Sequence, residues 1–196
     1  MHNKLLVKYD DVLKKAGFIL KHAKTDDIGY DVPVVMNDKL KISPHKDYYI
    51  DWKERWFDIP PMGIAEVPCG LAVKIPGAAW GNIKPRSSTG WKRHLVVYEG
   101  VIDSGFTGPL FVLVKNPNAE TVRIHEFEKL AQLILIPKFL VWEAEEDVPN
   151  SWASDGKQTF PVTKRTPLVG HPIEIIGVDE LPKTERSTDG FGSTGR

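Results

Sequence analysis

The chain has 196 residues, a length that fits a single domain. Hydrophobic residues make up 41% of the sequence, which is enough to bury a core and excludes wholesale disorder. Lys and Arg together number 26, as do Asp and Glu, so the chain lacks the basic excess of a protein that coats nucleic acid. We therefore expect no nucleic-acid partner, although a local cationic pocket for a small phosphorylated ligand remains compatible with this composition.

The cysteine count and the N-terminus bear on the cellular compartment. Cys69 is the single cysteine and cannot form an internal disulfide, which indicates a reducing compartment. The N-terminal sequence MHNKLLVKYDD lacks the apolar core of a signal peptide, and no apolar run is long enough to span a bilayer. We expect a soluble, cytoplasmic protein without a membrane partner.

The elements predicted along the chain are mostly strands. Residues 5–9 are the first predicted strand, and residues 10–16 carry a weak helical signal that ends at a glycine. In residues 71–75 apolar side chains alternate with a period of two, which predicts a strand with one buried face. The continuous apolar runs 110–114 and 133–136 predict strands that are buried on both faces.

Frequent turns separate these apolar segments. The chain contains 15 prolines and 16 glycines, and many short strands joined by turns are typical of a sandwich or barrel. The sequence thus predicts one all-β domain over residues 1–196 with short helical turns. Two stretches, 43–60 and 143–171, are interpreted as solvated surface loops, and the Gly- and Ser-rich residues 184–196 as a flexible terminus.

Several common catalytic patterns are absent from the sequence. The 6 histidines show no metal-ligand spacing, and a lone cysteine cannot complete a zinc site. The G-x-S-x-G nucleophile motif and the glycine patterns of P-loop and Rossmann proteins are also missing. The chemistry must therefore come from a different arrangement of residues.

Polar residues interrupt strand-like sequence at four places. These segments are Gly29–Asp31, Pro85–Gly90, Gly100–Gly108 and Ala131–Leu133. Taken singly, they are best interpreted as two turns, a hairpin and a polar strand residue. A fifth segment, Thr184–Gly195, would by itself be a frayed terminus.

In order and spacing, these five segments resemble the five motifs of the trimeric dUTPase family. The resemblance runs from Leu5 to Gly195, and its tail has the form R-x4-F-G-S-T-G. It implies a jelly-roll-like β-barrel that assembles as a homotrimer with swapped C-terminal tails. It also implies hydrolysis of dUTP to dUMP and pyrophosphate, by attack of water on the α-phosphorus with Mg²⁺ as cofactor. Residues 43–60 and 143–171 would then be insertions, and residues 184–196 an arm that closes a neighbouring subunit's site.

The resemblance also implies roles for individual residues. Asp103 would contribute mainly by positioning the attacking water and only secondarily by accepting its proton, since an ordinary carboxylate is a weak base at neutral pH. Gln132 would hold the same water or an α-phosphate oxygen, and Asp31 would act near the metal through water. Mg²⁺ would be held mainly by substrate phosphates and waters. Substrate contacts are expected from Arg86, Ser87, Ser88, Gly100, Val101, Ile102, Phe106, Arg186, Phe191, Gly192 and Ser193.

These residue types suit the chemistry of a nucleoside triphosphate. Arg186 can bind terminal phosphate oxygens in a bidentate manner, with two parallel N–H donors of its guanidinium group. The hydroxyls and backbone N–H groups of Ser87 and Ser88 can surround a phosphate. Phe191 can stack on uracil, a contact worth roughly 1–3 kcal/mol in other base-stacking proteins.

The third motif departs from the usual family pattern, Asp-x-Asp-Tyr-Arg-Gly. Phe106 keeps an aromatic ring for the deoxyribose but lacks the phenol, while Gly105 and Thr107 remove a carboxylate and a cation. In the fifth motif, Asp189 stands where glycine is common and adds negative charge near the triphosphate.

Two other functions stay open at this point. The first is a dCTP deaminase, which resembles dUTPases in fold and in the Arg-Ser-Ser turn. Deamination needs a glutamate that moves protons, and Leu113 occupies the matching position here. The second is a dUTPase-fold protein that acts chiefly by binding a protein partner through residues 143–171.

Overall fold

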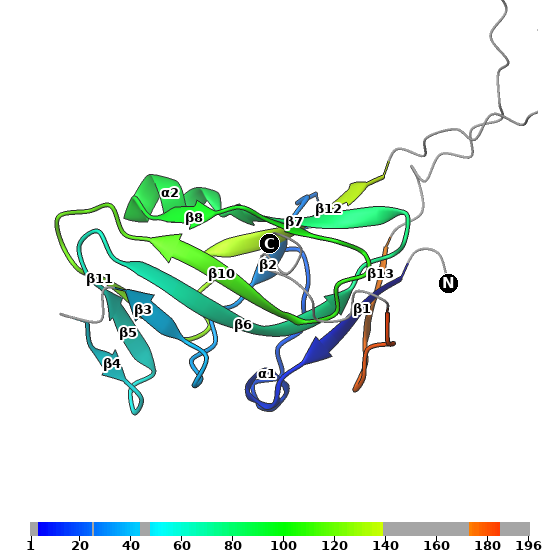
Figure 1. Cartoon of the computed structure of the whole chain (residues 1–196), viewed down its shortest axis with the longest axis horizontal. Helices are drawn as coiled ribbons and strands as arrows, with labels where there is room; N and C mark the ends of the chain where they lie inside the picture. The colour runs from blue at the N-terminus through cyan, green and yellow to red at the C-terminus, as the bar shows by residue number, and fades with distance from the viewer. Residues whose placement is uncertain (1–3, 25, 44–47, 139–172, 185–196) are drawn as a thin grey trace, which may run out of the picture.

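The computed structural model describes residues 4–24, 26–43, 48–138 and 173–184. Short strands dominate this part of the chain, and the two helices are brief (Figure 1). The elements are β1 (Lys4–Tyr9), α1 (Asp11–Lys15), β2 (Tyr30–Val32), β3 (Lys41–Ser43), β4 (Ile50–Asp51), β5 (Trp56–Ile59), β6 (Ile64–Lys74), β7 (Ala79–Pro85), α2 (Ser87–Arg93), β8 (Val96–Tyr98), β9 (Gly100–Ile102), β10 (Pro109–Lys115), β11 (Val122–His125), β12 (Ala131–Pro137) and β13 (Glu174–Gly177).

The strands form three sheets among the described residues. The largest runs in the order β13-β1-β6-β10-β8, with β3 also paired to β6. A second sheet has the order β2-β12-β7-β9, and a third has the order β11-β5-β4. Figure 1 shows the third sheet at one end of the molecule and the β1–β13 pair at the other. The all-β prediction is confirmed.

Alternating side chains of these strands build the core. In β6 the residues Val67, Leu71 and Val73 are buried, and the cross-strand partner of Val73 is Val7 of β1. Leu133 of β12 is fully buried opposite Ile83 of β7. In these strands the buried side chains are therefore mostly every second residue, as expected for antiparallel strands that place one face on the core.

The first predicted strand and the short helix are both confirmed. Strand β1 covers residues 4–9, and helix α1 follows it directly. Asp10 caps the helix by accepting a hydrogen bond of 2.9 Å from the backbone N–H of Leu13. Leu13 is fully buried and Val12 packs against the core beside it, so apolar contacts anchor this short helix.

Burial of β10 and β12 on both faces is a wrong prediction. Their burial alternates along the strand, and Leu113 of β10 is 39% exposed. Both strands lie in antiparallel sheets, where only one face packs against this chain's own core. A run of apolar residues on the other face consequently remains accessible.

Residues 50–59 do not form the solvated loop that was expected. They form the β4–β5 hairpin, which pairs with β11 and buries Phe57 and Ile59 completely. On its outer side the ring of Trp56 lies 5.1 Å from that of Tyr49, and the guanidinium carbon of Arg123 lies 3.3 Å from the Trp56 ring centre. This segment is therefore part of the folded body. Residues 143–171 lie outside the described residues.

Two further observations limit the chemistry. Cys69 is fully buried, and burial raises the pKa of its thiol to about 12, so it is not a nucleophile at neutral pH. Within the described ranges, no helix combines the length and the apolar composition needed to cross a membrane.

Candidate active site

Three of the five sequence motifs meet in one pocket of about 430 Å³. Asp31 comes from the first motif, Arg86 and Ser87 from the second, and Gln132 from the fourth. The described residues that line it are Ala23, Asp26, Asp27, Ile28, Gly29, Asp31, Arg86, Ser87, Gln132 and Ile134. Segments that are about 100 residues apart in sequence thus form a single polar cavity.

Strand register explains how these segments meet. Gln132 of β12 lies between Asp31 of β2 and Lys84 of β7 as their cross-strand partner. Residues that face each other across antiparallel strands project from the same side of the sheet. Arg86 and Ser87 follow the end of β7, where α2 begins, so they reach the same side. The expectation of a simple turn at residues 85–90 is wrong, because Ser87 starts a helix.

Asp31 is the electrostatic centre of this pocket. Its side chain is 7% exposed, with Oδ1 2.7 Å from Nε of Arg86 and Oδ2 3.6 Å from Nζ of Lys129. A buried carboxylate needs such compensation, since an unpaired buried charge costs several kcal/mol. Oδ2 nevertheless has no hydrogen-bond partner among the described residues, because the contact with Lys129 is longer than a hydrogen bond.

Gln132 is held in place by the backbone on both sides. Its Nε2 donates a hydrogen bond of 3.1 Å to the carbonyl of Pro85. On the other side lies Gly29, where an added Cβ would come within 2.0 Å of Oε1 of Gln132. Only a glycine leaves room for this amide, which accounts for the glycine of the first motif.

The Gly29→Ala variant should therefore lose activity by displacing Gln132. We expect kcat/KM for dUTP to fall by roughly 10- to 100-fold, in line with misplacement of a positioning group by about 1 Å. Gly77→Ala is the matched control, since an added Cβ at Gly77 has no atom within 4 Å. Steady-state kinetics of both variants decide the matter, and equal activities would show that the Gly29–Gln132 contact has no part in the site.

The third motif lies away from this pocket. Its strand β9 pairs with β7, placing Ile102 opposite Gly81, and Asp103 begins the turn that follows. By the same register, the β7 residue opposite Asp103 lies near the start of β7, whereas Arg86 follows its end. These two positions are about six residues apart along β7. At roughly 3.3 Å per residue, this separation is about 20 Å. Asp103 does not line the pocket.

The remaining predicted residues lie at various depths. Phe106 is 8% exposed and belongs to the core, whereas Val101 is 68% exposed. Ser88 is the second residue of α2 and is half-buried. The residues of the fifth motif, Arg186, Phe191, Gly192 and Ser193, lie outside the described residues.

Sequence reasoning missed Lys129, Asp26 and Asp27. Lys129 precedes the fourth motif, and its contact with Asp31 depends on strand pairing that no local pattern reveals. Asp26 and Asp27 line the pocket just before the first motif. In the sequence, only their position shortly before Gly29 of the first motif could have indicated that they belong to the site.

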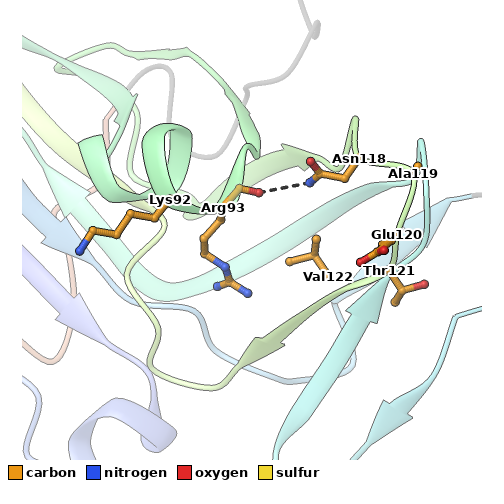
Figure 2. A pocket seen from close by; sticks show the side chains of 7 residues that line it. All are labelled: Lys92, Arg93, Asn118, Ala119, Glu120, Thr121 and Val122. Atoms are coloured by element: carbon orange, nitrogen blue, oxygen red, sulfur yellow. Dashed lines mark hydrogen bonds between the residues drawn. The ribbon is translucent and has the colours of Figure 1, made fainter.

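A second hollow, of about 490 Å³, lies beside the C-terminal end of α2 (Figure 2). It is lined by Lys92 and Arg93 from the helix and by residues 118–122. The Asn118 side chain donates a hydrogen bond of 3.2 Å to the carbonyl of Arg93 across it. None of the predicted site residues that the structure describes lines this hollow, so the smaller pocket is the candidate active site.

Comparisons with known proteins bear on this site. A family model described as dUTPase matches residues 52–159, which is more than half of the chain. A deoxyuridine 5'-triphosphate nucleotidohydrolase of Escherichia phage T5 is 32% identical over 139 residues, covering 70% of this chain and 72% of the phage protein. The Gloeothece citriformis protein of the same name is 25% identical over 185 residues, covering 93% and 92%. The match with the Arabidopsis thaliana protein, at 29% identity, covers 63% of that protein's length.

Solved structures agree on the fold. The dUTPase of Staphylococcus bacteriophage 80alpha has a TM-score of 0.54 at 22% identity, covering 76% of this chain and 99% of the phage chain. A mutant dUTPase from phage phi11 of S. aureus has a TM-score of 0.53 at 24% identity, covering 74% and 99%. From the family model and the sequence relatives together, the chain belongs to the dUTPase family.

Proposed function

We propose that this chain hydrolyses dUTP to dUMP and pyrophosphate in sites that are each shared between copies of the chain. Family membership supports the reaction. One observation supports a shared site. Asp31, Arg86 and Gln132 line one pocket, whereas Asp103 lies at the other end of β7, about 20 Å from Arg86. A second copy has to supply Asp103 if all four act on one substrate.

A homotrimer satisfies this requirement. The outer face of the second sheet supports contact with another copy, since Val101, Asn82 and Ile134 are neighbours across β9, β7 and β12. Val101 is largely exposed, so contact with another copy would remove its apolar surface from water.

The pocket residues divide the work of binding. Asp31 fixes Nε of Arg86, and Nη1 of Arg86 donates to the carbonyl of Lys129, so the guanidinium is preorganised. Asp31 neutralises one of the two cations it touches, which leaves the group of Asp31, Arg86 and Lys129 with one net positive charge. That local charge can bind a phosphate oxygen, while Asp26 and Asp27 in the same lining make a further cation beside the phosphates necessary. Ser87 adds a hydroxyl at the pocket wall.

Mg²⁺ fits this pocket as a partner of the substrate. Within the described part of the chain no group of three or more His, Cys, Asp or Glu residues is arranged to hold a metal ion. The lining carries three carboxylates, of Asp26, Asp27 and Asp31, against one guanidinium, and this excess of negative charge suits a divalent cation that keeps its waters. When bound, Mg²⁺ would neutralise the phosphates. The related phi11 phage protein coordinates a structural Mg(II) ion.

The remaining steps belong to Asp103 and the tail. Asp103 from a neighbouring copy orients a water toward the α-phosphorus and accepts its proton as the bond to pyrophosphate breaks. Gln132 holds the same water or an α-phosphate oxygen. Arg186 binds the terminal phosphates, and Phe191 stacks on uracil. We expect these last two residues to reach a third copy's site.

Deamination of dCTP is not favoured. Leu113 lies on β10 where a deaminase would need a proton-transferring glutamate, and a leucine side chain cannot exchange protons. A partner-binding role for residues 143–171 concerns a segment outside the described residues.

A substrate panel tests the proposed function. Purified chain is incubated with Mg²⁺ and dUTP, dTTP, dCTP or UTP, and released pyrophosphate and ammonia are measured. We expect pyrophosphate from dUTP far above the other three nucleotides, and no ammonia from dCTP. Ammonia release, or equal hydrolysis of all four nucleotides, would overturn the assignment.

A further inference from the structure

The turn that follows β9 is held by side chains from three other parts of the chain. The backbone N–H of Phe106 donates to the carbonyl of Asp103 at 3.0 Å, which closes a turn with Ser104 and Gly105 at its centre. Glycine has the largest backbone freedom of any residue, so a Ser-Gly turn is intrinsically loose. Its orientation therefore depends on contacts from outside.

Two lysines bind Ser104 from different strands. Nζ of Lys74, the last residue of β6, donates to the carbonyl of Ser104 at 2.5 Å. Nζ of Lys138, directly after β12, donates to the hydroxyl of Ser104 at 2.8 Å. Because both ammonium groups bind Ser104, they lie close together. Burial lowers the pKa of Lys74, and the nearby charge of Lys138 lowers it further. Such crowding of like charges is unfavourable unless both groups gain hydrogen bonds.

A third contact comes from the C-terminal segment. The hydroxyl of Thr184 donates to the carbonyl of Gly105. Thr184 is the first residue of the fifth motif, so the start of that segment is attached to the same turn. Both central carbonyls of the turn and its single hydroxyl are thus bound by side chains that are distant in sequence.

We propose that Lys74, Lys138 and Thr184 form a turn brace, which holds the Ser104–Gly105 turn so that the Asp103 carboxylate keeps the orientation needed for water attack. These three are positioning residues, since each acts through the turn. The inference rests on the proposed function, in which Asp103 orients the water. An active site needs its reacting groups preorganised to within a fraction of an ångström, and a rigid turn provides that for Asp103.

The test compares kinetics of lysine variants with a matched control. Lys74→Met and Lys138→Met keep the length of the side chain but remove its charge and donors, and Lys39→Met does the same at an exposed lysine elsewhere. We expect the double variant Lys74→Met/Lys138→Met to lower kcat for dUTP by roughly 10- to 100-fold with KM within about twofold. Lys39→Met should leave both constants unchanged.

A double-mutant cycle separates positioning from general destabilisation. In an Asp103→Asn background, the two lysine substitutions should lower kcat by less than about twofold, since the group they position is already disabled. Ser104→Ala, which removes only the hydroxyl bound by Lys138, should match Lys138→Met in effect. This variant also provides the test if the double variant does not fold.

Two results would overturn the brace. One is a full loss from the lysine substitutions in the Asp103→Asn background. The other is a raised KM with unchanged kcat, which would identify the lysines as substrate-binding groups. A wild-type chain that does not hydrolyse dUTP would instead refute the proposed function, so the two failures are distinguishable.

Discussion

Replacing Asp103 with asparagine is expected to lower kcat for dUTP by about 10²- to 10⁴-fold, the usual cost of removing a positioned base. Asparagine keeps the shape of the side chain, so the turn and substrate binding should persist and KM should change little. The exposed Asp38 offers a matched control, since Asp38→Asn removes the same charge at a residue outside the five motifs. Turnover within about threefold of wild type in the Asp103→Asn variant would remove Asp103 from the mechanism.

Co-expression of two inactive variants shows whether the site is shared. Arg86→Ala disables the pocket, and Asp103→Asn disables the turn. In a shared site, a mixed oligomer contains some sites with an intact pocket from one chain and an intact turn from another. Random assortment of equal amounts gives about one quarter of sites with both groups intact, because each contributor is correct half of the time. A site within one chain would give no recovery, so activity of the co-expressed oligomer discriminates the two arrangements.

Local sequence patterns predicted the strands well for a physical reason. Alternation of apolar side chains is decided within a few residues, so β1 and the end of β6 could be recognised without any partner strand. Helix α2 could not. Its sequence, SSTGWKR, contains turn-forming residues, and contacts across the chain stabilise its start. The Arg86 N–H and the Thr89 hydroxyl both donate to the carbonyl of Leu130, which only the folded chain brings near.

In the candidate site, too, some features could be predicted from local sequence and others depend on contacts across the chain. Asp31, Arg86 and Gln132 could be identified from the order of the motifs, and the structure places them in one pocket. The partnership of Asp31 with Lys129 could not be identified, because it depends on the pairing of β2 with β12. The β4–β5 hairpin was missed for a similar reason, since its mixed charges conceal Phe57 and Ile59 until β11 pairs beside them.

Discrimination against dCTP should be the largest specificity effect of this enzyme. Among the described residues, β9 has a strand partner on one side only, so its other edge offers free backbone donors and acceptors. Gly100 has open space beside it, and Val101 is exposed. This edge can form hydrogen bonds with the uracil ring. A site built to hydrogen-bond one edge rejects a mismatched edge by about 10⁴- to 10⁵-fold, because its own groups are left unpaired.

Discrimination against UTP should be weaker, because it depends on an apolar contact. The extra 2'-hydroxyl of UTP would meet the ring of Phe106, which carries no polar group that could lose a partner. Apolar contacts reject an added hydroxyl by only about 10²-fold. Phe106 is 8% exposed, so the core fixes its ring and leaves only a small part of the residue's surface accessible. The ratio of kcat/KM values should therefore place UTP between dUTP and dCTP.

Variants of Phe106 separate the two kinds of discrimination. Phe106→Ala would cost about 3–5 kcal/mol of stability at this buried position, so Phe106→Leu is the better choice, with its melting temperature measured alongside. We expect Phe106→Leu to raise kcat/KM for UTP relative to dUTP, while the ratio for dCTP stays nearly unchanged, since the backbone of β9 still reads the base. If the wild-type chain accepts dCTP more readily than UTP, the edge of β9 does not read the base, and the sugar contact becomes the main source of specificity.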